Sequence, residues 1–358
     1  MHDVDVTVIG AGQAGLSAAH HLRRRGIDGA RLRVVDAEQG PGGAWRHRWP
    51  TLTVSRLNGI FALPDQQRGQ ARADEPANVA VPAWFADYEA RQGIEVLRPV
   101  EVERVTDVAD PDDDRLEVTA SIGTWRTRAI VNATGTWRRP HWPAVPGQRM
   151  FGGRQLHTHD YPGPEPFADA RVLVVGGGIS GAGHVVELAE VARTRWVTRR
   201  KPNWRGEDFT EEHGRAVIER VQARVREGLP TRSVVAETGL PDRGRFATAR
   251  RAGVLVRHPM FDRLEVDGPV WADGTRWPAD VVVWATGFRP EVDHLAPLRL
   301  RTPRGGIRVE GSQAVDDQRI HLVGYGPSAS TIGANRYGRD AAIAITRRLD
   351  AGGRIATG

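Results

Sequence analysis

Three glycines near the amino-terminal end of the sequence stand at a spacing that can hold a phosphate group. Residues 10–15 read GAGQAG, a G-x-G-x-x-G pattern formed by Gly10, Gly12 and Gly15. The first glycine permits a tight turn, the second lets the backbone approach a pyrophosphate, and the third lets a helix pack against a strand. Free N–H groups at the start of the helix then face the phosphates. With Gln13 and Ala14 between them, these glycines predict a dinucleotide-binding site.

The residues on both sides of this pattern supply the elements that it needs. A strand is expected over Val4–Ile9 and a helix from the pattern to about Arg25, and a second strand over Arg31–Val35 ends in Asp36. Asp36 stands 21 residues after Gly15, about the distance at which an acidic residue accepts hydrogen bonds from a ribose. The succession of strand, glycines, helix, strand and acid favours a ligand site over a glycine-rich turn that binds nothing.

Later segments could extend the same site. Gly43, Ala44 and Trp45 follow a glycine-rich turn, and Arg48 lies among aromatic residues, so this stretch could meet a flat ring or a phosphate. A turn followed by a core tryptophan is the alternative. A buried strand later ends in an Ala-Thr-Gly turn, at the kind of strand end where open α/β sheets bind ligands. The further candidates for this site are Val102, Ala133, Thr134, Gly135 and Gly324.

A second G-x-G-x-x-G pattern occupies residues 176–181. It follows a strand expected over Arg171–Val175 and precedes a helix expected to end near Ala192. The next expected strand, Arg195–Val197, ends in Thr-Arg-Arg instead of an acid, and arginine there suits a 2′-phosphate, which favours NADPH over NADH. An arginine pair on a solvated strand end is the alternative. The candidates for this site are Gly176, Gly178, Ser180, Gly181, Thr198, Arg199 and Arg200.

The order of elements after the second pattern repeats the order after the first. A hairpin with an Asp-Gly turn is expected over 271–277, and a buried strand over Val281–Trp284 leads into Ala285, Thr286 and Gly287. The chain therefore carries two related nucleotide-binding modules. The predicted fold is α/β, with two Rossmann-like dinucleotide-binding domains, of which one comprises residues 1–165 and 289–358 and the other, inserted domain comprises residues 166–288.

Hydrophobic periodicity predicts further elements between these landmarks. A helix over Thr210–Arg226 would bury Val217, Val221 and Val225 as one packing stripe. The other expected elements are a helix over Pro82–Gln92, an alternating strand over Val96–Val108, a hairpin of Leu116–Ala120 with Trp125–Ala129, a strand over 320–324, and a helix over Asn335–Leu349.

Composition narrows the class of protein. The chain has 358 residues, 40% of them hydrophobic, which suits a globular protein of two domains. Cysteine is absent, which excludes disulfides and a redox-active cysteine pair. No apolar run is long enough to span a membrane, and the first strand begins too early to leave room for a secretion signal, so a cytoplasmic protein is expected. The net charge of +6 comes almost entirely from arginines scattered along the chain, which favours a solvated basic surface over a nucleic-acid site.

One further motif narrows the family. Residues 151–161 read FGGRQLHTHDY and match F-x-G-x-x-x-H-x-x-x-Y through Phe151, Gly153, His157 and Tyr161. With the two dinucleotide patterns around it, this motif resembles the signature of class B flavoprotein monooxygenases. The terminal tyrosine is similar to flavin-containing monooxygenases, whereas Baeyer–Villiger monooxygenases usually have tryptophan. The length resembles that of compact bacterial members.

The resemblance implies a reaction and its cofactors. NADPH would reduce FAD, dioxygen would form a flavin C4a-hydroperoxide, and one oxygen atom would pass to a sulfur or nitrogen nucleophile or to a ketone. NADH use stays open, since some compact relatives relax the preference. Asn58 resembles an asparagine placed near the flavin, and His157 would lie at the junction of the domains, so both are catalytic candidates. The expected partners are a small-molecule substrate and dioxygen, without nucleic acid or membrane, and a homodimer is left open.

Several other classes of protein share parts of this pattern. A flavin disulfide reductase shares both modules but needs the cysteine pair that this chain lacks. A flavin reductase or NADPH oxidase that inserts no oxygen, and a dinucleotide sensor without turnover, remain open. No metal site is predicted, because His157 with His159 and Asp160 gives one H-x-H without further spaced ligands.

Overall fold

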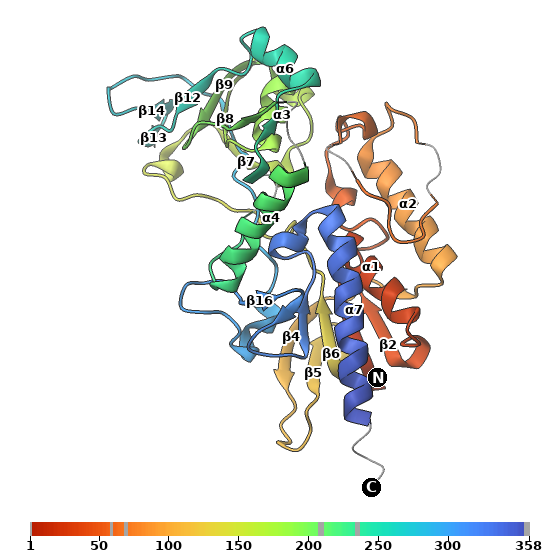
Figure 1. Ribbon diagram of the computed structural model, residues 1–358. Coiled ribbons are helices and arrows are strands. Elements are labelled where there is room, and N and C mark those ends of the chain that lie inside the picture. The colour runs from red at the N-terminus through yellow and green to blue at the C-terminus, as the bar shows by residue number, and fades with distance from the viewer. Residues whose placement is uncertain (1, 58–59, 68–70, 207–210, 233–236, 354–358) are drawn as a thin grey trace.

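The structure, a computed structural model, describes residues 2–57, 60–67, 71–206, 211–232 and 237–353, without the side chains of 211–215, 352 and 353. Two α/β units follow each other along the long axis of the molecule (Figure 1). The lower unit in that view holds the N-terminal strand and the last helix, and the upper unit is built from the middle of the chain. The predicted α/β class with two Rossmann-like units is confirmed.

The lower unit is organised around a sheet of nine strands. Its central strands are parallel, and β1 (Val4–Ile9) lies between β2 (Leu32–Val35) and β6 (Gly123–Asn132). The full path is β16 (Val309–Glu310), β17 (Gln313–Ala314), β18 (Ile320–Leu322), β6, β1, β2 and β3 (Val96–Leu97), and β4 (Val102–Asp107) and β5 (Leu116–Ala120) extend β6 as an antiparallel meander.

Both faces of this sheet are buried. On β6, Ala129 and Val131 pack into one hydrophobic cluster and Ile130 into the other, because successive side chains of a strand point to opposite faces. Helices α1 (Gln13–Arg23) and α7 (Thr331–Gly353) lie side by side on the first face (Figure 1). The opposite face is covered by the meander and by the short helix η7 (Asp293–Leu298).

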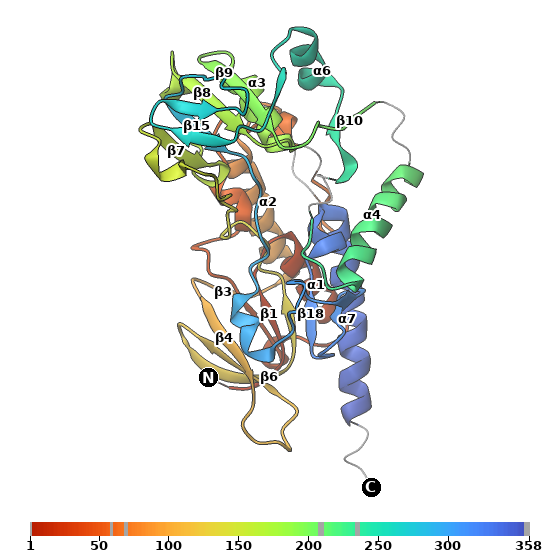
Figure 2. The ribbon, with the colours of Figure 1, turned by 90° about the vertical axis from the view of Figure 1, so that its left-hand side faces the viewer.

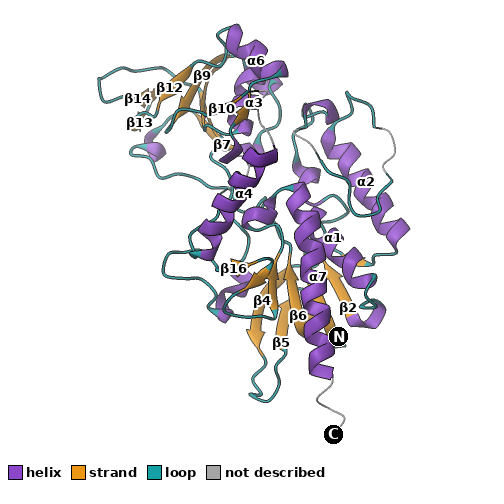
Figure 3. Cartoon of the chain, viewed as in Figure 1, coloured by secondary structure: helices purple, strands orange, loops and turns teal. Residues whose placement is uncertain are grey.

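The upper unit holds a parallel sheet of five strands, which Figure 3 shows above and apart from the larger one. Helix α3 (Ile179–Leu188) packs on it, and α6 (Gly244–Arg251) packs on α3. The strands run in the order β12 (Arg257–Pro259), β9 (Arg193–Thr198), β8 (Arg171–Val175), β15 (Val281–Trp284) and β7 (Arg154–His157), and small pairs are formed by β10 (Trp204–Arg205) with β11 (Leu240–Pro241) and by β13 (Arg263–Glu265) with β14 (Gly268–Val270).

The chain passes between the units along two paired connections. The outgoing segment 135–141 and the returning segment 287–291 run side by side, and are held by His141 N–H to Gly287 O at 2.9 Å and Glu291 N–H to Gly135 O at 3.0 Å. Because β7 pairs with β15, the upper unit takes in residues from before 166.

Helix α4 (Glu211–Arg226) belongs to the middle of the chain but packs on the lower unit (Figures 1 and 2). Val217, Val221 and Val225 are all buried, which confirms the predicted stripe. Val225 contacts η8 (Gly326–Ala329), where a Cβ on Gly326 would lie 2.6 Å from a Val225 methyl carbon.

Some predicted elements were wrong in their limits. The strand expected over Val96–Val108 is broken into β3 and β4, because Pro99 has no N–H to continue the ladder. Helix α2 (Ala77–Gln92) begins five residues before Pro82, since Ala77, Ala80 and Val81 are buried in the core and offset the backbone bond that the proline removes.

The C-terminal helix α7 starts at Thr331, four residues before its predicted start. The hairpin expected over 271–277 keeps its Asp-Gly turn, with Gly274 at φ +82°, but forms no strands there. The amide of Trp271 bonds across the turn to the Thr275 carbonyl, and the antiparallel pair forms earlier, between β13 and β14.

Val225→Ala should destabilise the protein by about 1–3 kcal/mol, because it leaves a cavity where α4 meets the lower unit. Chemical denaturation followed by circular dichroism measures the change. Ile218→Ala, on the exposed side of the same helix, is the matched control and should change stability by less than about 0.5 kcal/mol. Equal effects would mean that α4 does not use this stripe to bind the lower unit.

Candidate functional site

The first glycine pattern forms a turn in which three backbone segments touch. Gly10 has φ +97°, and a Cβ there would lie 2.6 Å from the Ala133 carbonyl oxygen. A Cβ on Gly15 would lie 1.8 Å from the Gly10 carbonyl oxygen. Both approaches are far closer than any side chain tolerates, so α1 and the ends of β1 and β6 can meet only as bare backbone.

Gly12 behaves differently, because no atom of the described residues lies within 4 Å of its hypothetical Cβ. It caps the N-terminus of α1 with extended backbone and no side-chain bond, so the first N–H groups of the helix have no side-chain acceptor among the described residues. Gly12, Gln13 and Ala14 all border an open cavity. The positive end of α1 therefore faces this space.

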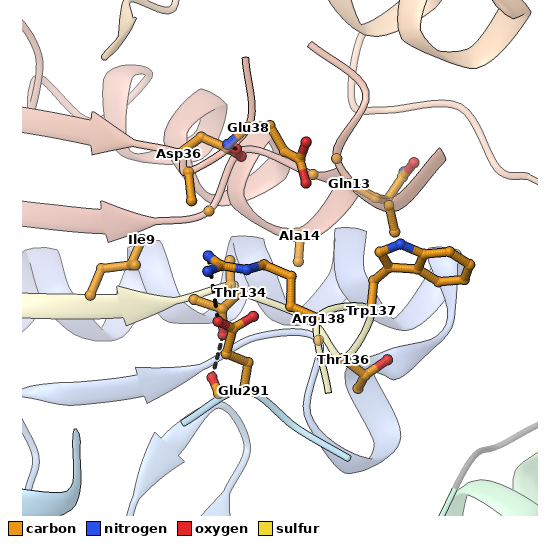
Figure 4. Close-up of a pocket in the computed structure, with 18 of the residues that line it drawn as sticks. Ile9, Gln13, Ala14, Asp36, Glu38, Thr134, Thr136, Trp137, Arg138 and Glu291 are labelled. Carbon is orange, nitrogen blue, oxygen red and sulfur yellow. Dashed lines mark hydrogen bonds and ion pairs between the residues drawn. The ribbon is translucent and has the colours of Figure 1, made fainter. Parts of the chain in front are cut away.

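The cavity has a volume of about 310 Å³ and lies at the carboxyl edge of the larger sheet. Figure 4 shows side chains from β1, the β2 end, the β6 end and the returning segment converging on it. Of the candidates for the first site, those that line the cavity are Gly10, Gly12, Gln13, Ala14, Asp36, Gly43, Ala44, Trp45, Arg48, Val102, Ala133, Thr134, Gly135 and Gly324.

Asp36 closes one end of the cavity and is 6% exposed. Its carboxylate accepts hydrogen bonds from the Ala11 N–H and, at 2.8 Å, from the Glu38 N–H. Glu38 also lines the cavity, and its carboxylate is held by His47 Nε2 at 2.8 Å and by Arg46 at 3.7 Å. Two fixed carboxylates, one of them not foreseen from the sequence, can thus accept hydrogen bonds from hydroxyl groups.

An aromatic and cationic wall closes another side. Trp137 stacks on Phe288 with centroids 4.9 Å apart, and the guanidinium carbon of Arg48 lies 4.1 Å above the Trp137 ring. The sequence pointed to Arg48 and Trp45 but not to Trp137 or Phe288, which are brought here by the paired connections between the units.

Arg48 is a cation without a counter-charge among the described residues. It forms none of the ion pairs there, and its buried Nε has no hydrogen-bond partner. Burial lowers the pKa of Arg48 to about 10, so the side chain stays charged at neutral pH. A half-buried guanidinium beside a cavity is costly unless a bound group supplies the missing interaction.

A second polar network lies across the cavity, and Figure 4 shows it between Arg138 and Glu291. Arg138 donates to Glu101 at 2.6 Å and lies 3.6 Å from Glu291. Thr134 Oγ1 donates to the Glu291 carbonyl at 2.5 Å. Burial raises the pKa of Glu291, although Arg138 opposes the shift. No sequence pattern indicated Glu101, Arg138 or Glu291, because these three charges come from separate segments.

The second glycine pattern repeats the first in the upper unit. A Cβ on Gly176 would lie 2.1 Å from the Ala285 carbonyl oxygen, and a Cβ on Gly181 would lie 2.2 Å from the Gly176 carbonyl oxygen. Gly178 caps α3, whose first turn contains Ser180. The neighbouring carboxyl ends of β8, β9 and β15 bring Thr198, Arg199, Arg200, Ala285, Thr286 and Gly287 to one edge of the sheet.

Asn58 and His157 are the two residues that the sequence suggested as catalytic. Asn58 lies outside the described residues. His157, at the end of β7, is fully buried, and its ring packs edge-on against Phe288 at 4.9 Å. His157 is not part of the cavity lining, but Phe288, which it contacts, is. Burial lowers the pKa of His157 to about 4, so the ring is neutral at pH 7, and its Nδ1 accepts a hydrogen bond from the His159 N–H.

The last residue of the same motif ties the units together. Tyr161 is 3% exposed, and its hydroxyl donates to Glu187 of α3 at 3.3 Å. Arg56, from the lower unit, lies 3.3 Å from the other oxygen of Glu187. Burial raises the pKa of Glu187, while Arg56 and Tyr161 oppose the shift.

The described residues contain neither a metal-binding cluster nor a membrane-spanning helix. Within the described part of the chain, no group of three or more His, Asp or Glu side chains could hold a metal ion. Across those residues, no helix is at once long and apolar enough to cross a bilayer.

Comparison with known proteins assigns this architecture. A family model for pyridine nucleotide-disulphide oxidoreductases matches residues 4–325, and the chain belongs to that family. The predicted resemblance to flavoprotein monooxygenases is also confirmed. A solved flavin-containing monooxygenase from Stenotrophomonas maltophilia is 37% identical, with 98% of this chain and 100% of that one covered and a TM-score of 0.82. A double mutant of a flavin monooxygenase from the same organism gives 38% identity, the same coverage and a TM-score of 0.83.

More distant relatives match this chain over only part of their length. An uncharacterized oxidoreductase from Geobacillus kaustophilus is 31% identical over 53% of this chain and 52% of its own length. A flavin-containing monooxygenase from Arabidopsis thaliana is 24% identical over 79% of this chain and 62% of its own. The chain thus spans about half to three fifths of these curated relatives. A solved cyclohexanone monooxygenase, at 18% identity and a TM-score of 0.67, shares the fold.

Gly15→Ala and Gly12→Ala should separate folding from binding. Gly15→Ala forces a Cβ into the Gly10 carbonyl and should lower the thermal midpoint of the flavin-free protein by several degrees. Gly12→Ala meets open space, so it should leave that midpoint within about one degree while reducing the flavin content of the purified protein. Thermal scans and absorbance at 450 nm measure both. A normal flavin content in Gly12→Ala would contradict the close approach of a pyrophosphate.

His157 should make the protein sensitive to acid. Its pKa is about 4 in the folded protein and 6.5 when unperturbed, so the unfolded chain binds the extra proton first as pH falls. Above pH 6.5 His157 is neutral in both states and does not change the free energy of unfolding. Between pH 6.5 and 4 the unfolded chain is protonated and the folded protein is not, so the free energy of unfolding falls. His157→Asn should reduce the slope of unfolding free energy against pH in this window by up to one proton, about 1.4 kcal/mol per pH unit. An unchanged slope in denaturation series would show that His157 does not titrate as described.

Proposed function

We propose that this protein is an FAD- and NADPH-dependent monooxygenase that transfers one oxygen atom from dioxygen to a small substrate. The observation that carries the proposal is the pair of matching glycine turns. One opens on a cavity with an arginine that forms no ion pair with the described residues, and the other opens on a strand end with two more arginines. The 38% identity to a flavin monooxygenase over nearly the whole chain supports it. The substrate would be a soft sulfur or nitrogen nucleophile or a ketone.

The residues around the first cavity fit FAD. Three of its lining side chains bury a polar atom without a partner among the described residues, namely Gln13 Oε1, Arg48 Nε and Trp137 Nε1. The open N-terminus of α1 suits the pyrophosphate, and Asp36 and Glu38 suit the hydroxyl groups of a ribose or ribityl chain. Arg48, which lies over the rings of Trp45 and Trp137, suits a phosphate or another anionic group, and the two tryptophans suit a flat ring.

The second pattern fits NADPH. The N-terminus of α3 suits its pyrophosphate, and Arg199 and Arg200 suit the 2′-phosphate that distinguishes NADPH from NADH. Arg289, which the sequence did not single out, adds positive charge near Arg199. Burial lowers the pKa of His141, and the charges of Arg289 and Arg199 lower it further. We accordingly propose that the residues before the outgoing connection form the FAD domain together with residues 289–358. The middle of the chain, from β7 on, would form the NADPH domain.

The protein's own contribution to the reaction would be positioning and exclusion of water. Bound FAD would supply the redox chemistry, accepting a hydride from NADPH and activating dioxygen. The balanced reaction consumes substrate, dioxygen, NADPH and a proton and yields oxygenated substrate, NADP⁺ and water. Neutral His157 and the aromatic rings of Trp137 and Phe288 would keep the junction of the units dry, while Arg48 would place a fixed positive charge there.

Methyl phenyl sulfide with ¹⁸O₂ tests the proposal on purified, FAD-loaded protein with NADPH. The expected product is sulfoxide carrying ¹⁸O, in enantiomeric excess and in proportion to the NADPH consumed. Catalase is present throughout, and hydrogen peroxide without protein gives the racemic background.

Two results would overturn the proposal. Stoichiometric hydrogen peroxide in parallel reactions without catalase, with no oxygenated product from this sulfide or from amine and ketone substrates, would identify an NADPH oxidase. A colourless protein that cannot be reconstituted with FAD would exclude the flavoprotein altogether.

A further inference from the structure

Arg257 makes two hydrogen bonds to the end of the neighbouring strand in the upper unit. It lies in β12, the edge strand next to β9, where Pro259 is in register with Thr198. Arg257 Nε donates to Thr198 Oγ1 at 3.1 Å, and Nη2 donates to the Thr198 carbonyl at 3.0 Å. The planar guanidinium thus clamps both the side chain and the backbone of one residue.

Thr198 passes this restraint on to the arginine pair. It is 1% exposed, and its hydroxyl donates to the Arg200 carbonyl at 2.7 Å while it accepts from Arg257. A chain of hydrogen bonds therefore runs from Arg257 through the Thr198 hydroxyl to the backbone of Arg200. Arg199 lies between Thr198 and Arg200, the two residues of the turn that these hydrogen bonds restrain.

The same turn rests directly on the second glycine pattern. A Cβ on Gly177 would lie 3.5 Å from the Thr198 methyl carbon and 4.0 Å from the Arg200 carbonyl oxygen. The arginine-bearing turn and the proposed pyrophosphate-binding turn are therefore packed against each other, and a displacement of one alters the distance between the two phosphate sites.

The turn carries charge that the described residues do not neutralise. Arg199 and Arg200 are exposed, and neither they nor Arg257 form an ion pair with an acid in the described part of the chain. Other arginines of the upper unit do, as Arg171 with Asp280 at 2.6 Å and Arg263 with Glu265 at 2.6 Å. Adjacent like charges repel, so nothing in their own side chains keeps Arg199 and Arg200 turned toward one anion.

We propose that Arg257 is a positioning residue for specificity: by clamping Thr198 it holds the turn that presents Arg199 and Arg200 to the 2′-phosphate of NADPH. This inference rests on the proposed use of NADPH. Arg257 acts through Thr198 and the Arg200 backbone, so its geometry matters more than its charge. A lysine at this position would keep the charge but could not make both bonds in one plane.

Equilibrium dissociation constants of NADP⁺ and NAD⁺, measured by isothermal titration calorimetry on the flavin-loaded protein, test the inference. Arg257→Met should weaken NADP⁺ binding about tenfold and leave NAD⁺ binding within about twofold. Arg199→Ala, the direct contact, should weaken NADP⁺ by about tenfold to a hundredfold. Arg193→Met, at the exposed opposite end of β9, is the matched control and should change neither constant.

Arg257→Lys separates geometry from charge. If Arg257 positions the turn, the lysine variant should resemble Arg257→Met in its ratio of NADP⁺ to NAD⁺ affinity. Restoration of the wild-type ratio by lysine would overturn the positioning role. If Arg257→Met does not fold, Thr198→Val breaks the same hydrogen-bond chain in an isosteric way and should reduce the ratio as well.

The outcomes distinguish this inference from the proposed function. A wild-type protein that binds NADP⁺ no better than NAD⁺ overturns both the NADPH assignment and the role of Arg257. A wild-type preference that Arg199→Ala reduces and Arg257→Met and Thr198→Val leave unchanged overturns the inference alone. Equal weakening of NADP⁺ and NAD⁺ by Arg257→Met would reduce Arg257 to a support of the sheet edge and would likewise overturn it.

Discussion

Both units depend on the same close approach of backbone to backbone. In the lower unit the start of α1 presses Gly15 against Gly10, which in turn touches Ala133, and in the upper unit Gly181, Gly176 and Ala285 meet in the same way. No side chain fits at these contacts, so the helix comes near enough to the sheet for its first N–H groups to open on the strand ends. A surface of peptide groups alone follows from this approach, and in the proposed function it binds a phosphate while the charged side chains around it add selectivity.

The junction between the units places chemistry where neither unit could place it alone. The paired connections bring Trp137 and Phe288 together over Arg48, and Tyr161 and Arg56 meet on Glu187 from opposite units. A cofactor bound in the lower unit and a dinucleotide bound in the upper one would therefore face each other across a mostly aromatic boundary. Helix α4, which leaves the upper unit to pack on the lower one, adds a further connection.

Sequence patterns predicted the elements with strong periodicity or obligatory glycines. The strand Val4–Ile9, the strand Val281–Trp284 and the valine stripe of α4 were expected and found, because burial of both sheet faces or of one helix face leaves a repeating apolar pattern. The limits of α2 and the break at Pro99 were not foreseen, since a buried helix start can outweigh a proline inside the helix and a missing N–H can outweigh an alternating pattern.

The sequence by itself determined the two glycine turns, the acid after one and the arginines after the other, because those residues act through local backbone geometry that spacing records. Tertiary structure alone decided that Glu101, Arg138 and Glu291 meet on one cavity, that Arg48 lies over Trp137 with no counter-charge among the described residues, and that Arg257 clamps Thr198. These contacts join residues far apart in the chain, and their partners are chosen by the register of strands and the course of connections, which no local pattern encodes.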